Sequence, residues 1–312
     1  MYDSTKPYKK QVIELIKQTW QTPYVSVENN RVRKKFSYQE YHHSDGIGTK
    51  GVYHWKQRSL ESAVIDAMAM NLNDLAMMRA TPYAVIDHIF LPEDNREAIL
   101  DIIKQLTNMC KKRNIAITGG ETAIHNLKDE LEISITMLGF IRDYQPNQFE
   151  IGDVLIGIES NGLHSNGFTR IREVFGGEFR PEFIIPTNIY SDTILELNER
   201  FNIHGMMHIT GGAYTKLKDL LNIADAQITR RHELKPQRIF EELYRRGVPE
   251  EEMYKTFNCG IGFILSVPQQ EADSIVSEIN KRGFGSESVG KVIPGNGKIK
   301  IESAFSDKEI EF

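Results

Sequence analysis

A chain of 312 residues can form one large domain or two of ordinary size, and about 75% of the unfolded surface can be buried at this length. Its 38 Lys and Arg residues nearly balance 43 Asp and Glu residues, the formal net charge is −5, and neither sign forms a long block. These values argue against nucleic acid as the main partner. The two cysteines, Cys110 and Cys259, lack a CxxC partner, which indicates neither a disulfide framework nor a thiolate zinc site and favours a reducing cytosol.

The sequence contains no recognisable targeting or membrane segment. The amino terminus, MYDSTKPYKKQ, lacks the apolar core of a signal peptide, and no apolar run approaches the ~18 residues that would span a bilayer. We therefore expect a cytoplasmic protein without a membrane partner.

The first part of the chain predicts alternating helices and strands. Apolar residues at helical spacing predict a helix over 8–20, and alternation over 33–44 predicts a strand that ends at DGIGTK (45–50). An Ala- and Met-rich run predicts a long buried helix over 59–79. The remaining expected elements are a strand over 82–91, a helix to about 113, and strands over 115–118 and 133–141.

A second unit follows the polar stretch 143–153, which is typical of a linker. Strand and helix patterns alternate again, which favours two α/β or α+β sandwiches over a bundle or a barrel. We place the domains at 1–145 and 146–312. The expected elements are a strand at 154–158, helices ending near 175, at 188–201, at 213–222 and up to 255, a strand at 261–267, a helix at 269–282 and a closing pair of strands.

The DGIGTK segment gathers groups that handle metal and phosphate. Gly46 and Gly48 let the backbone approach an anion, and Thr49 adds a hydroxyl group. Lys50 can neutralise phosphate oxygens, whereas Asp45 is a hard oxygen ligand of the kind that Mg²⁺ prefers. Taken alone, the motif is equally compatible with a tight turn that carries a solvated Asp and Lys.

The long predicted helix carries few polar groups, among which Asp66, Asn73 and Asp74 stand out. Seven residues correspond to about 700° of rotation, so Asp66 and Asn73 share a face. Asp66 and Asp74 are separated by ~12 Å along the helix axis, so they cannot both coordinate one ion directly. A buried carboxylate is costly unless it is paired or metal-bound, so at least one should face a site. For Asp66, a buried group that ties the helix to the sheet is an equally good interpretation.

The TGGET segment (118–122) directly follows a predicted strand, at a place where we expect the chain to turn into a cleft. Glu121 is then the natural third oxygen ligand. Asp45, Asp74 and Glu121 would converge on ATP-bound Mg²⁺, which usually takes one or two carboxylates plus substrate phosphates. A plain glycine turn is the alternative interpretation.

Two glycine-containing loops precede predicted helices in the second unit. NGLHSNG (161–167) leads into a helix with Ser165 and Asn166 as candidate caps, and HITGG (208–212) repeats the pattern. A helix start preceded by glycine is a ready anion site, so two such loops suggest a phosphorylated ligand.

Three further residues have more than one interpretation. His164 and His208 can donate hydrogen bonds or move protons, but a lone histidine is more often structural. Cys259, in FNCGIGF, is better explained as a small buried residue than as a nucleophile, because no basic residue is adjacent to lower its pKa.

The order of the segments is more specific than any one of them. The series DGIGTK, NDL, GGETA, GDVLIG with SNGLHSNG, HITGG and MYKTFNCGIG, from about residue 45 to 263, resembles the aminoimidazole ribonucleotide synthetase (phosphoribosylformylglycinamidine cyclo-ligase) family. The resemblance implies a two-domain α/β fold with an N-terminal ATP- and metal-binding domain and a C-terminal α/β sandwich that binds substrate. It also implies a homodimer, in which the N-terminal domains pair through β-structure, and an active site between domains.

The implied reaction closes the imidazole ring of formylglycinamidine ribonucleotide in de novo purine biosynthesis, using ATP, Mg²⁺ and sometimes K⁺. The γ-phosphate goes onto the amide oxygen, the amidine nitrogen attacks that carbon, and phosphate leaves. Metal ions and Lys50 would stabilise the transferring phosphoryl group, and the two glycine loops would supply proximity.

The family's site residues carry over onto matching positions of this sequence. Lys50, His164 and His208 are the catalytic candidates, and Asp45, Asp74 and Glu121 are the metal candidates. The nucleotide candidates are Asp45, Gly46, Gly48, Thr49, Lys50, Asn73, Asp74, Gly119, Gly120, Glu121 and Thr122. The substrate candidates are Ser160, Asn161, Gly162, His164, Ser165, Asn166, Gly167, Thr210, Gly211 and Gly212.

The chain also departs from the family pattern. The segment before Asp45 has no glycine, so the loop that would fold over ATP is missing or replaced, with Lys34, Lys35 and the pair 42–43 as candidates. Ala213 stands where a third glycine follows HITGG, and GGETAIH lacks the expected Met-Pro. The substrate end is thus less similar to the family than the ATP end.

Two other functions remain open. One is another phosphoryl-transfer enzyme of the superfamily, such as a thiamine-phosphate kinase or a selenophosphate synthetase, although the latter needs a reactive cysteine near the N-terminus and none precedes Cys110. The other is a non-catalytic ATP-binding paralogue, against which Asp45, Lys50, Asp74 and Glu121 argue.

Overall fold

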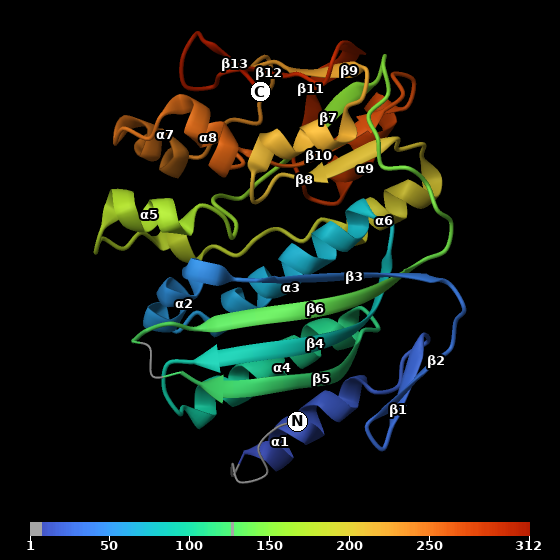
Figure 1. The fold of residues 1–312 in the computed structure, drawn as a ribbon, viewed down its shortest axis with the longest axis vertical. Coiled ribbons are helices and arrows are strands. Elements are labelled where there is room, and N and C mark those ends of the chain that lie inside the picture. Colours follow the sequence, from blue (N-terminus) through green and yellow to red (C-terminus); the bar gives the residue numbers. More distant parts are fainter. Residues whose placement is uncertain (1–7, 126–127) are drawn as a thin grey trace. The chain divides into compact units, whose positions relative to one another are not determined.

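Two units, each with its own main sheet, divide the chain at residues 144 and 145 (Figure 1). The computed structural model describes residues 8–125 and 128–312, so the first seven residues of the polar amino terminus lie outside the described residues. In the described ranges, no helix is both long enough and apolar enough to cross a membrane. The mixed α/β class expected from the sequence is confirmed.

The N-terminal unit is built on a four-stranded sheet in the order β3-β6-β4-β5. Only β4 and β5 run parallel, whereas β6 is antiparallel to both β3 and β4. The elements of this unit are α1 (Lys9–Ile16), η1 (Lys17–Thr19), β1 (Val25–Glu28), β2 (Arg31–Lys34), β3 (Gln39–Gly46), η2 (Gly48–Lys50), α2 (Gly51–Gln57), α3 (Leu60–Met77), β4 (Thr81–Leu91), α4 (Arg96–Lys112), β5 (Ala116–Ile124) and β6 (Glu132–Ile141).

Helices α3 and α4 cover one face of this sheet, and α1 packs beside α4 (Figure 1). The Ala- and Met-rich α3 is buried on nearly every side, as expected for a helix that is apolar all round. Helix α4 begins where the Asn95 side chain accepts a 3.0 Å hydrogen bond from the Ala98 amide, a standard N-cap. Both helices lie close to their expected positions.

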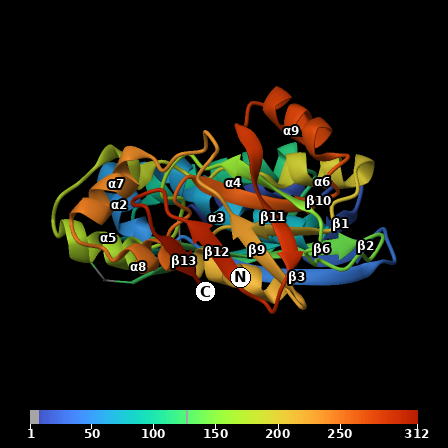
Figure 2. The same ribbon diagram turned by 90° about the horizontal axis from the view of Figure 1, so that it is seen from above.

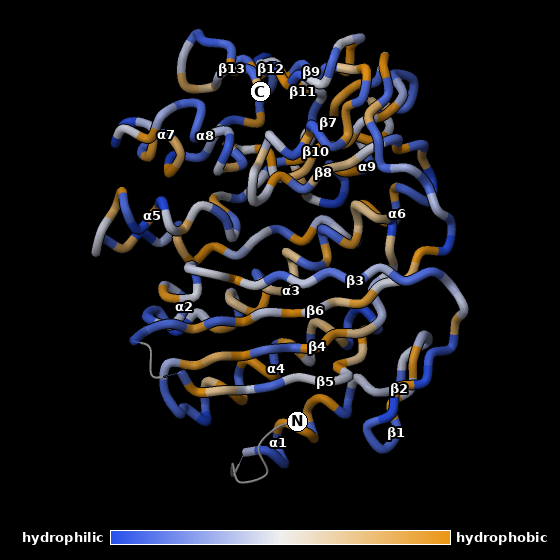
Figure 3. Tube along the Cα trace, viewed as in Figure 1, coloured by the Kyte–Doolittle hydropathy of each residue, from blue (hydrophilic) through white to orange (hydrophobic). Residues whose placement is uncertain are grey.

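The opposite face of the sheet is covered only in part. The β1–β2 hairpin packs Val25 and Val27 against Ala84, Ala116 and Phe140 at one end of this face. Farther along, alternate residues of β6, from Glu132 to Thr136, are only half-buried. Strand β2 is exposed along its length and is mostly hydrophilic in Figure 3. We call the part of this face beyond the hairpin the open face.

Three expectations for this unit need correction. TGGET does not turn into a cleft but continues β5, which pairs with β4 from Ala116 to Ile124, so backbone hydrogen bonding prevails over the glycine signal. The strand expected at 33–44 is divided between β2 and β3. Helix α2 was not expected, because its seven residues are too few for a clear periodic pattern.

The C-terminal unit contains a seven-stranded sheet in the order β13-β12-β9-β11-β7-β10-β8. Its central strands β7 and β10 are buried almost throughout, which explains their continuous apolar sequences. The elements are β7 (Val154–Glu159), α5 (Phe168–Phe175), η3 (Pro181–Ile184), α6 (Ser191–Arg200), β8 (Gly205–His208), η4 (Ala213–Leu220), β9 (Ala224–Ile228), α7 (Arg238–Arg245), α8 (Glu250–Thr256), β10 (Ile261–Val267), α9 (Ala272–Lys281), β11 (Ser286–Pro294), β12 (Ile299–Glu302) and β13 (Glu309–Glu311).

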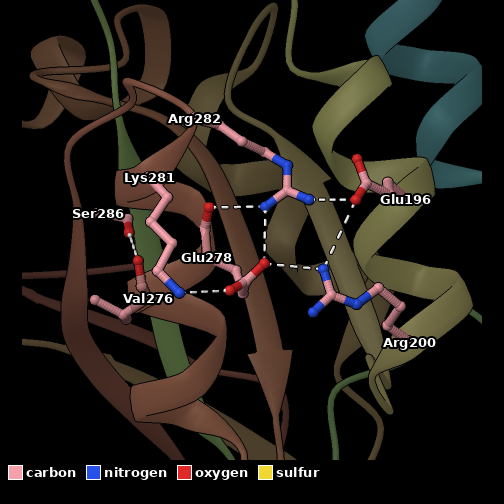
Figure 4. A network of polar contacts seen from close by, with 7 residues as sticks. All are labelled: Glu196, Arg200, Val276, Glu278, Lys281, Arg282 and Ser286. Atoms are coloured by element: carbon pink, nitrogen blue, oxygen red, sulfur yellow. Dashed lines mark hydrogen bonds and ion pairs between the residues drawn. The ribbon is translucent and has the colours of Figure 1, made fainter.

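Helices α6 and α9 of this unit lie side by side (Figures 1 and 2) and are joined by a surface ion-pair network (Figure 4). The Glu278 carboxylate accepts from Arg200 at 2.9 Å and from Lys281 at 2.8 Å, and Arg282 bridges it to Glu196. These hydrogen bonds lower the pKa of Glu278 to about 2. The network joins the two helices at the protein surface, where each such pair contributes little to stability.

Several expectations for the C-terminal unit also change: β8 was not expected, and the closing pair of strands is three strands, β11, β12 and β13. The helix expected at 213–222 is a 3₁₀ helix, η4, that ends at Leu220. Strand β9 was missed, because its short ADAQI sequence carries carboxylate and amide groups that weaken the apolar alternation.

Candidate functional site

The DGIGTK loop is held tightly at the end of β3. A Cβ atom on Gly46 would lie 2.3 Å from Oε1 of Glu132 and 3.0 Å from the Ile133 carbonyl oxygen, and Gly48 has a φ of +52°. Asp45 Oδ1 accepts a 2.7 Å hydrogen bond from the Gly46 amide. Glu132, which the sequence analysis did not single out, forms the base of this loop, and burial raises the pKa of its carboxyl group. Close packing therefore requires glycine at position 46, and the positive φ favours glycine at position 48.

Lys50 occupies a position different from the one expected. Its side chain is fully buried, and Nζ lies 2.8 Å from Oδ2 of Asp66 on α3. The same carboxylate oxygen is 2.8 Å from His54 Nε2, whose other ring nitrogen contacts Ser59 Oγ at 2.8 Å. Burial acts to raise the pKa of Asp66, but the Lys50 ammonium prevails and holds that pKa below its usual range.

The expectation that Lys50 faces phosphate is therefore corrected: its ammonium group is held inside the unit by Asp66. Asp66 is a buried, hydrogen-bonded group, as its structural interpretation expected, but it ties α3 to Lys50 of η2 and His54 of α2 and not to the sheet. The physical reason is that a buried carboxylate needs a counterion, and Lys50 is the cation within reach.

A second polar cluster links the end of β3 to α3. The Asn71 amide group donates to the Asp45 backbone carbonyl oxygen at 3.1 Å, and Asn71 Oδ1 lies 3.1 Å from His43 Nδ1. His43 Nε2 is 3.2 Å from Asp74 Oδ2. The hydrogen bond with Asp74 raises the pKa of His43, against the opposing effect of burial. Neighbouring Asn73 is fully buried.

Glu121 lies on the open face of the N-terminal sheet, opposite the face that carries Asp45. Ile135 pairs with Asp45 on β3 and with Asp87 on β4, so these three residues share the face that α3 and α4 cover. Glu121 pairs with His88, the next residue along β4, and therefore points to the open face, because successive strand residues alternate.

The expected metal set is not gathered within one chain. Across residues 8–125 and 128–312, no three His, Cys, Asp or Glu groups are close enough together to hold a metal ion. Asp45 lies on the helix-covered face with the His43–Asp74 pair, whereas Glu121 points away from them. Metal binding by Asp45, Asp74 and Glu121 stays a prediction, and one copy of the sheet does not assemble the three groups.

Asp87 is a buried carboxylate that the sequence analysis missed. It is fully buried on β4, and a Cβ atom on Gly120 would lie 2.3 Å from Asp87 Oδ1. The signal was available, because Asp87 falls in the buried phase of the VIDHI alternation. Gly120 is thus needed to make room for this carboxylate.

Segments expected near the nucleotide lie beside the N-terminal helix. Gly119 and Gly120 line a pocket of about 470 Å³ together with Lys9, Lys17 and Trp20. The expected replacements for the family's ATP-covering loop have local partners instead. Lys34 pairs with Glu40, Lys35 donates to the Thr22 carbonyl oxygen, and the pair 42–43 contacts Glu40 and Asp74.

The two glycine loops of the C-terminal unit meet. The Asn166 amide group donates a short hydrogen bond to Thr210 Oγ1, and a Cβ atom on Gly211 would lie 3.3 Å from Asn166 Oδ1. Ser165 Oγ is 3.2 Å from Thr187 Oγ1, so neither Ser165 nor Asn166 caps α5. Gly167 is the N-cap, with a φ of +72°. The expected capping roles are corrected because both side chains bond to other segments.

Asn258, in the FNCG segment, connects these loops and was missed from the sequence. Its Nδ2 donates to the Gly162 carbonyl oxygen at 2.8 Å, and its Oδ1 accepts from Ser160 Oγ at 2.7 Å and from the Gly260 amide at 3.0 Å. Asn161 is exposed and donates to the Pro186 carbonyl oxygen at 2.9 Å. The sequence signal that could have identified Asn258 is a polar residue placed between apolar ones.

The two candidate histidines are buried near each other. The rings of His164 and His208 are 6.3 Å apart, with Tyr190 about equally far from both and Phe263 stacked on His208 at 6.0 Å. Cys259 is buried and free, and burial raises the pKa of its thiol, so its interpretation as a small buried residue is confirmed.

Two family models together match most of the chain. The AIR synthase related protein N-terminal domain matches residues 38–141, and the corresponding C-terminal domain matches residues 150–302. Phosphoribosylformylglycinamidine cyclo-ligase from Pyrococcus horikoshii is 34% identical over 276 residues, covering 83% of this chain and 81% of that protein. The enzyme of the same name from Clostridium perfringens is 35% identical over 83% of each chain.

The chain belongs to the phosphoribosylformylglycinamidine cyclo-ligase family. The resemblance drawn from the ordered motifs is thus confirmed. Residues before 38, which form α1, η1, β1 and β2, lie outside the matched range, in agreement with the unusual sequence before Asp45.

Solved structures show that the fold of this cyclo-ligase family member is widely shared. Hydrogenase maturation protein HypE from E. coli has a TM-score of 0.70 at 14% identity, covering 97% of this chain and 96% of that chain. Thiamine-monophosphate kinase from Stenotrophomonas maltophilia has a TM-score of 0.63 at 14% identity, covering 97% and 98%. At such identities the likeness shows the fold alone.

Removal of one buried charge in this family member should be costly. We expect Asp66→Asn to lower the free energy of unfolding by about 3–5 kcal/mol, because the buried Lys50 ammonium loses its counterion. Urea denaturation followed by circular dichroism measures the change. The double variant Lys50→Met/Asp66→Leu removes both charges and should be less destabilised than Asp66→Asn; a larger loss in the double variant would contradict this account.

The His43–Asp74 pair should make stability depend on pH. The folded pKa of His43 is raised above the ordinary value of about 6.5, so the pair stabilises fully below that pH and loses its contribution as pH rises through the folded pKa. We expect the excess Tm of the wild type over His43→Gln to shrink between about pH 6 and pH 9. His42→Gln, at the exposed neighbouring position, is the control. A Tm difference that does not change with pH would contradict a charged His43–Asp74 pair.

Gly167 should not tolerate a side chain. A Cβ atom there would lie 2.2 Å from Phe257 Cε1 at a φ of +72°, so Gly167→Ala should cost more than about 1 kcal/mol of unfolding free energy. Gly177→Ala is the matched control, because no atom lies within 4 Å of its Cβ position, and it should change stability by less than about 0.5 kcal/mol. Thermal denaturation of both variants measures the difference, and equal losses would rule out the contact.

Proposed function

We propose that this chain closes the imidazole ring of formylglycinamidine ribonucleotide, producing aminoimidazole ribonucleotide, ADP and phosphate. The observation that carries the proposal is membership of the cyclo-ligase family through both domain models, at residues 38–141 and 150–302. The reaction belongs to de novo purine biosynthesis. Two buried free cysteines suit a reducing compartment, and we place the reaction in the cytoplasm.

ATP is the proposed phosphoryl donor. The same fold carries ATP in a solved complex of HypE, which covers 99% of this chain at a TM-score of 0.70. The proposed nucleotide-binding residues of this chain surround the end of β3, the middle of α3 and β5. They are Asp45, Gly46, Gly48, Thr49, Asn73, Asp74, Gly119, Gly120, Glu121 and Thr122.

Lys50 has an indirect role in this proposal. Its buried ion pair with Asp66 at 2.8 Å holds the loop of Gly46 and Gly48 against α3, so that the backbone amides are fixed before the nucleotide binds. Such preorganisation stabilises charge on a transferring phosphoryl group without reorganisation during the reaction.

Mg²⁺ fits the oxygen groups around α3. The Asp45 backbone carbonyl and the Asp74 carboxylate are connected through Asn71 and His43. Two carboxylates completed by substrate phosphates match the usual coordination of this ion. When bound, the ion neutralises phosphate charge. Within a single chain, Glu121 does not belong to this set. K⁺ is a further candidate cofactor, for which we name no residues.

The C-terminal loops are proposed to hold the substrate phosphate and amide. Gly162, His164 and Gly167 all have positive φ, a backbone conformation that turns successive amides toward a shared anion. Asn166 joins this loop to Thr210, so both loops would move as one body. The proposed substrate-binding set is Ser160, Asn161, Gly162, His164, Ser165, Asn166, Gly167, Thr210, Gly211 and Gly212.

Chemistry at the amide requires activation and proximity. Transfer of the γ-phosphoryl group to the amide oxygen converts it into a leaving group, the amidine nitrogen attacks the same carbon, and phosphate departs as the ring closes. Buried His164 and His208 are the proposed groups for moving the amidine proton. The loops supply the orientation that makes an intramolecular attack fast.

A homodimer is proposed from the open face of the N-terminal sheet. This face is only half-buried beyond the β1–β2 hairpin, whereas the other is fully covered by helices. A second copy that pairs with the open face through β-structure would bury it. Glu121 points to this face and would then lie in the dimer interface.

The activity is tested with purified protein, ATP and Mg²⁺. ADP should form only when formylglycinamidine ribonucleotide is added, together with an equal amount of aminoimidazole ribonucleotide, measured by chromatography. ADP formation without this substrate, or none with it, would overturn the proposal. Turnover with thiamine monophosphate instead would identify a kinase.

The same assay separates the metal role from folding. Asp74→Asn should abolish Mg²⁺-dependent turnover and lower the Tm of the ligand-free protein by no more than His43→Gln does, because both changes remove the same pair. Glu61→Gln, at an exposed position of the same helix, is the control and should keep full activity. Loss of the folded state in Asp74→Asn would show a structural role instead.

A further inference from the structure

A pocket of about 470 Å³ lies in the N-terminal unit, between the outer edge of β5 and the segment that precedes residue 38. Helix α1 and η1 form one wall, Trp20 and the turn of the β1–β2 hairpin form another, and the 118–120 stretch of β5 forms the third. Figure 1 shows α1 and the hairpin on the β5 side of the sheet. The family model begins at residue 38, so most of this pocket is built from residues that the model does not match.

Trp20 presents its ring in a fixed position. Its Nε1 donates to the Ile117 carbonyl oxygen of β5 at 2.9 Å, and the Thr19 hydroxyl accepts from the Ile117 amide at 2.9 Å. The indole also packs against the hairpin core around Val25 and Val27. These contacts hold the ring beside the pocket before any ligand binds, so stacking on the ring requires little further ordering.

Gly119 lines the pocket although packing does not require a glycine there. The nearest atom to a Cβ on Gly119 would be Ile86 Cγ2 at 3.7 Å, an ordinary contact, and the φ of Gly119 is not in the left-handed region. Gly120, in contrast, leaves room for Asp87. In the described part of the chain β5 is an edge strand, so its outward N–H groups face no further strand. A glycine at such a place lets a ligand approach the backbone closely.

The charges of the pocket favour an anion. Lys9 and Lys17 both line it, and no acidic side chain belongs to its described lining. Lys17 is exposed, and its Nζ lies 5.7 Å from the centroid of the Trp20 ring. The cation–π contact of an exposed lysine is weak, so Lys17 can turn to a phosphate oxygen at little cost.

The hairpin turn adds polar groups to the lining. Asn29 and Asn30 form a two-residue loop between the paired residues Glu28 and Arg31, with φ values of +50° and +61°. Two left-handed residues are typical of a type I′ turn, in which asparagine is favoured, so the turn itself places both side chains beside the pocket. Each side-chain amide carries donor and acceptor atoms, as does the edge of a purine base.

We propose that this pocket binds a purine nucleotide, with its base stacked on Trp20 and its phosphate oxygens held by Lys9, Lys17 and the backbone at Gly119. The volume of about 470 Å³ falls within the range of about 300–1,000 Å³ that is usual for small-molecule sites. Inorganic polyphosphate would satisfy the lysines but would leave the indole and Ile13 without an apolar partner. Gly119 and Gly120 belong to the proposed nucleotide-binding set, so the inference rests on the proposed function and assigns the base to residues outside the family model.

Binding is tested on the full ligand-free chain by isothermal titration calorimetry with ADP, which cannot be turned over. We expect saturable binding of one molecule per chain, weakened by about tenfold or more in Trp20→Leu because base stacking is lost. Trp20→Phe keeps a flat ring and should stay within about threefold of the wild type. Circular dichroism of each variant establishes that it is folded.

The lysines are tested separately from the ring. Lys9→Gln/Lys17→Gln should weaken ADP by about tenfold and change adenosine binding little, whereas Trp20→Leu should weaken both. Lys10→Gln is the matched control, because Lys10 lies on the same helix, is exposed and is not in the described lining. Tripolyphosphate should bind more weakly than ADP and should not respond to Trp20→Leu.

Gly119→Ala separates ligand contact from folding. It should weaken ADP by about fivefold or more and leave the Tm of the ligand-free protein nearly unchanged, because its Cβ meets no atom closer than 3.7 Å. No saturable binding of ADP, equal affinity in the wild type and Trp20→Leu, or Trp20→Phe as weak as Trp20→Leu would overturn the proposal. Unchanged ADP affinity in Gly119→Ala would remove the backbone from it.

The outcome for the pocket is distinguishable from the outcome for the proposed function. Wild-type formation of aminoimidazole ribonucleotide by Trp20→Leu, with an unchanged KM for ATP, would overturn the pocket and leave the proposed function intact. Absence of this product from a wild type that binds ADP as expected would overturn the proposed function and leave the nucleotide pocket intact.

Discussion

The buried ion pair between Lys50 and Asp66 is the interaction on which the N-terminal unit depends. It joins the end of the DGIGTK segment to the centre of α3, and His54 and Ser59 complete its hydrogen bonds. Both side chains are fully buried. The attraction between two buried charges offsets the free energy of removing them from water only when their geometry and hydrogen bonding are good. The pair therefore holds the loop against α3, while Glu132 and Ile133 of β6 leave no room for a side chain at Gly46.

A comparable constraint in the C-terminal unit is the side chain of Asn258. It satisfies Ser160, the Gly162 carbonyl oxygen and the Gly260 amide at once, so three segments distant in sequence share one hydrogen-bonding centre. Asn166 and Thr210 add a direct link between the two glycine loops. The phosphate-binding geometry that we propose for these loops thus rests on side chains outside their glycine motifs.

The two faces of the N-terminal sheet divide the candidate residues. Asp45, His43 and Asp74 belong to the helix-covered face, whereas Glu121 belongs to the open face. The sequence motifs suggest that Asp45, Asp74 and Glu121 form one set. Because successive strand residues point to opposite faces, Glu121 of β5 lies on the face opposite Asp45 of β3. A second copy that covered the open face would place Glu121 in the interface of the proposed homodimer.

The sequence by itself determined the class of the fold, the long buried α3, the end of α4 and the family, because periodicity and motif order are local or linear properties. It also identified the two glycine loops and the buried character of Cys259. Only the tertiary structure decided that TGGET continues a strand, that Lys50 turns inward to Asp66, that Asn166 bonds to Thr210, and that Asp87 and Asn258 are buried polar centres. Each of these depends on a partner far away in sequence. Strand pairing and the need of a buried charge for a counterion are settled by which segments meet, and local patterns do not contain that information.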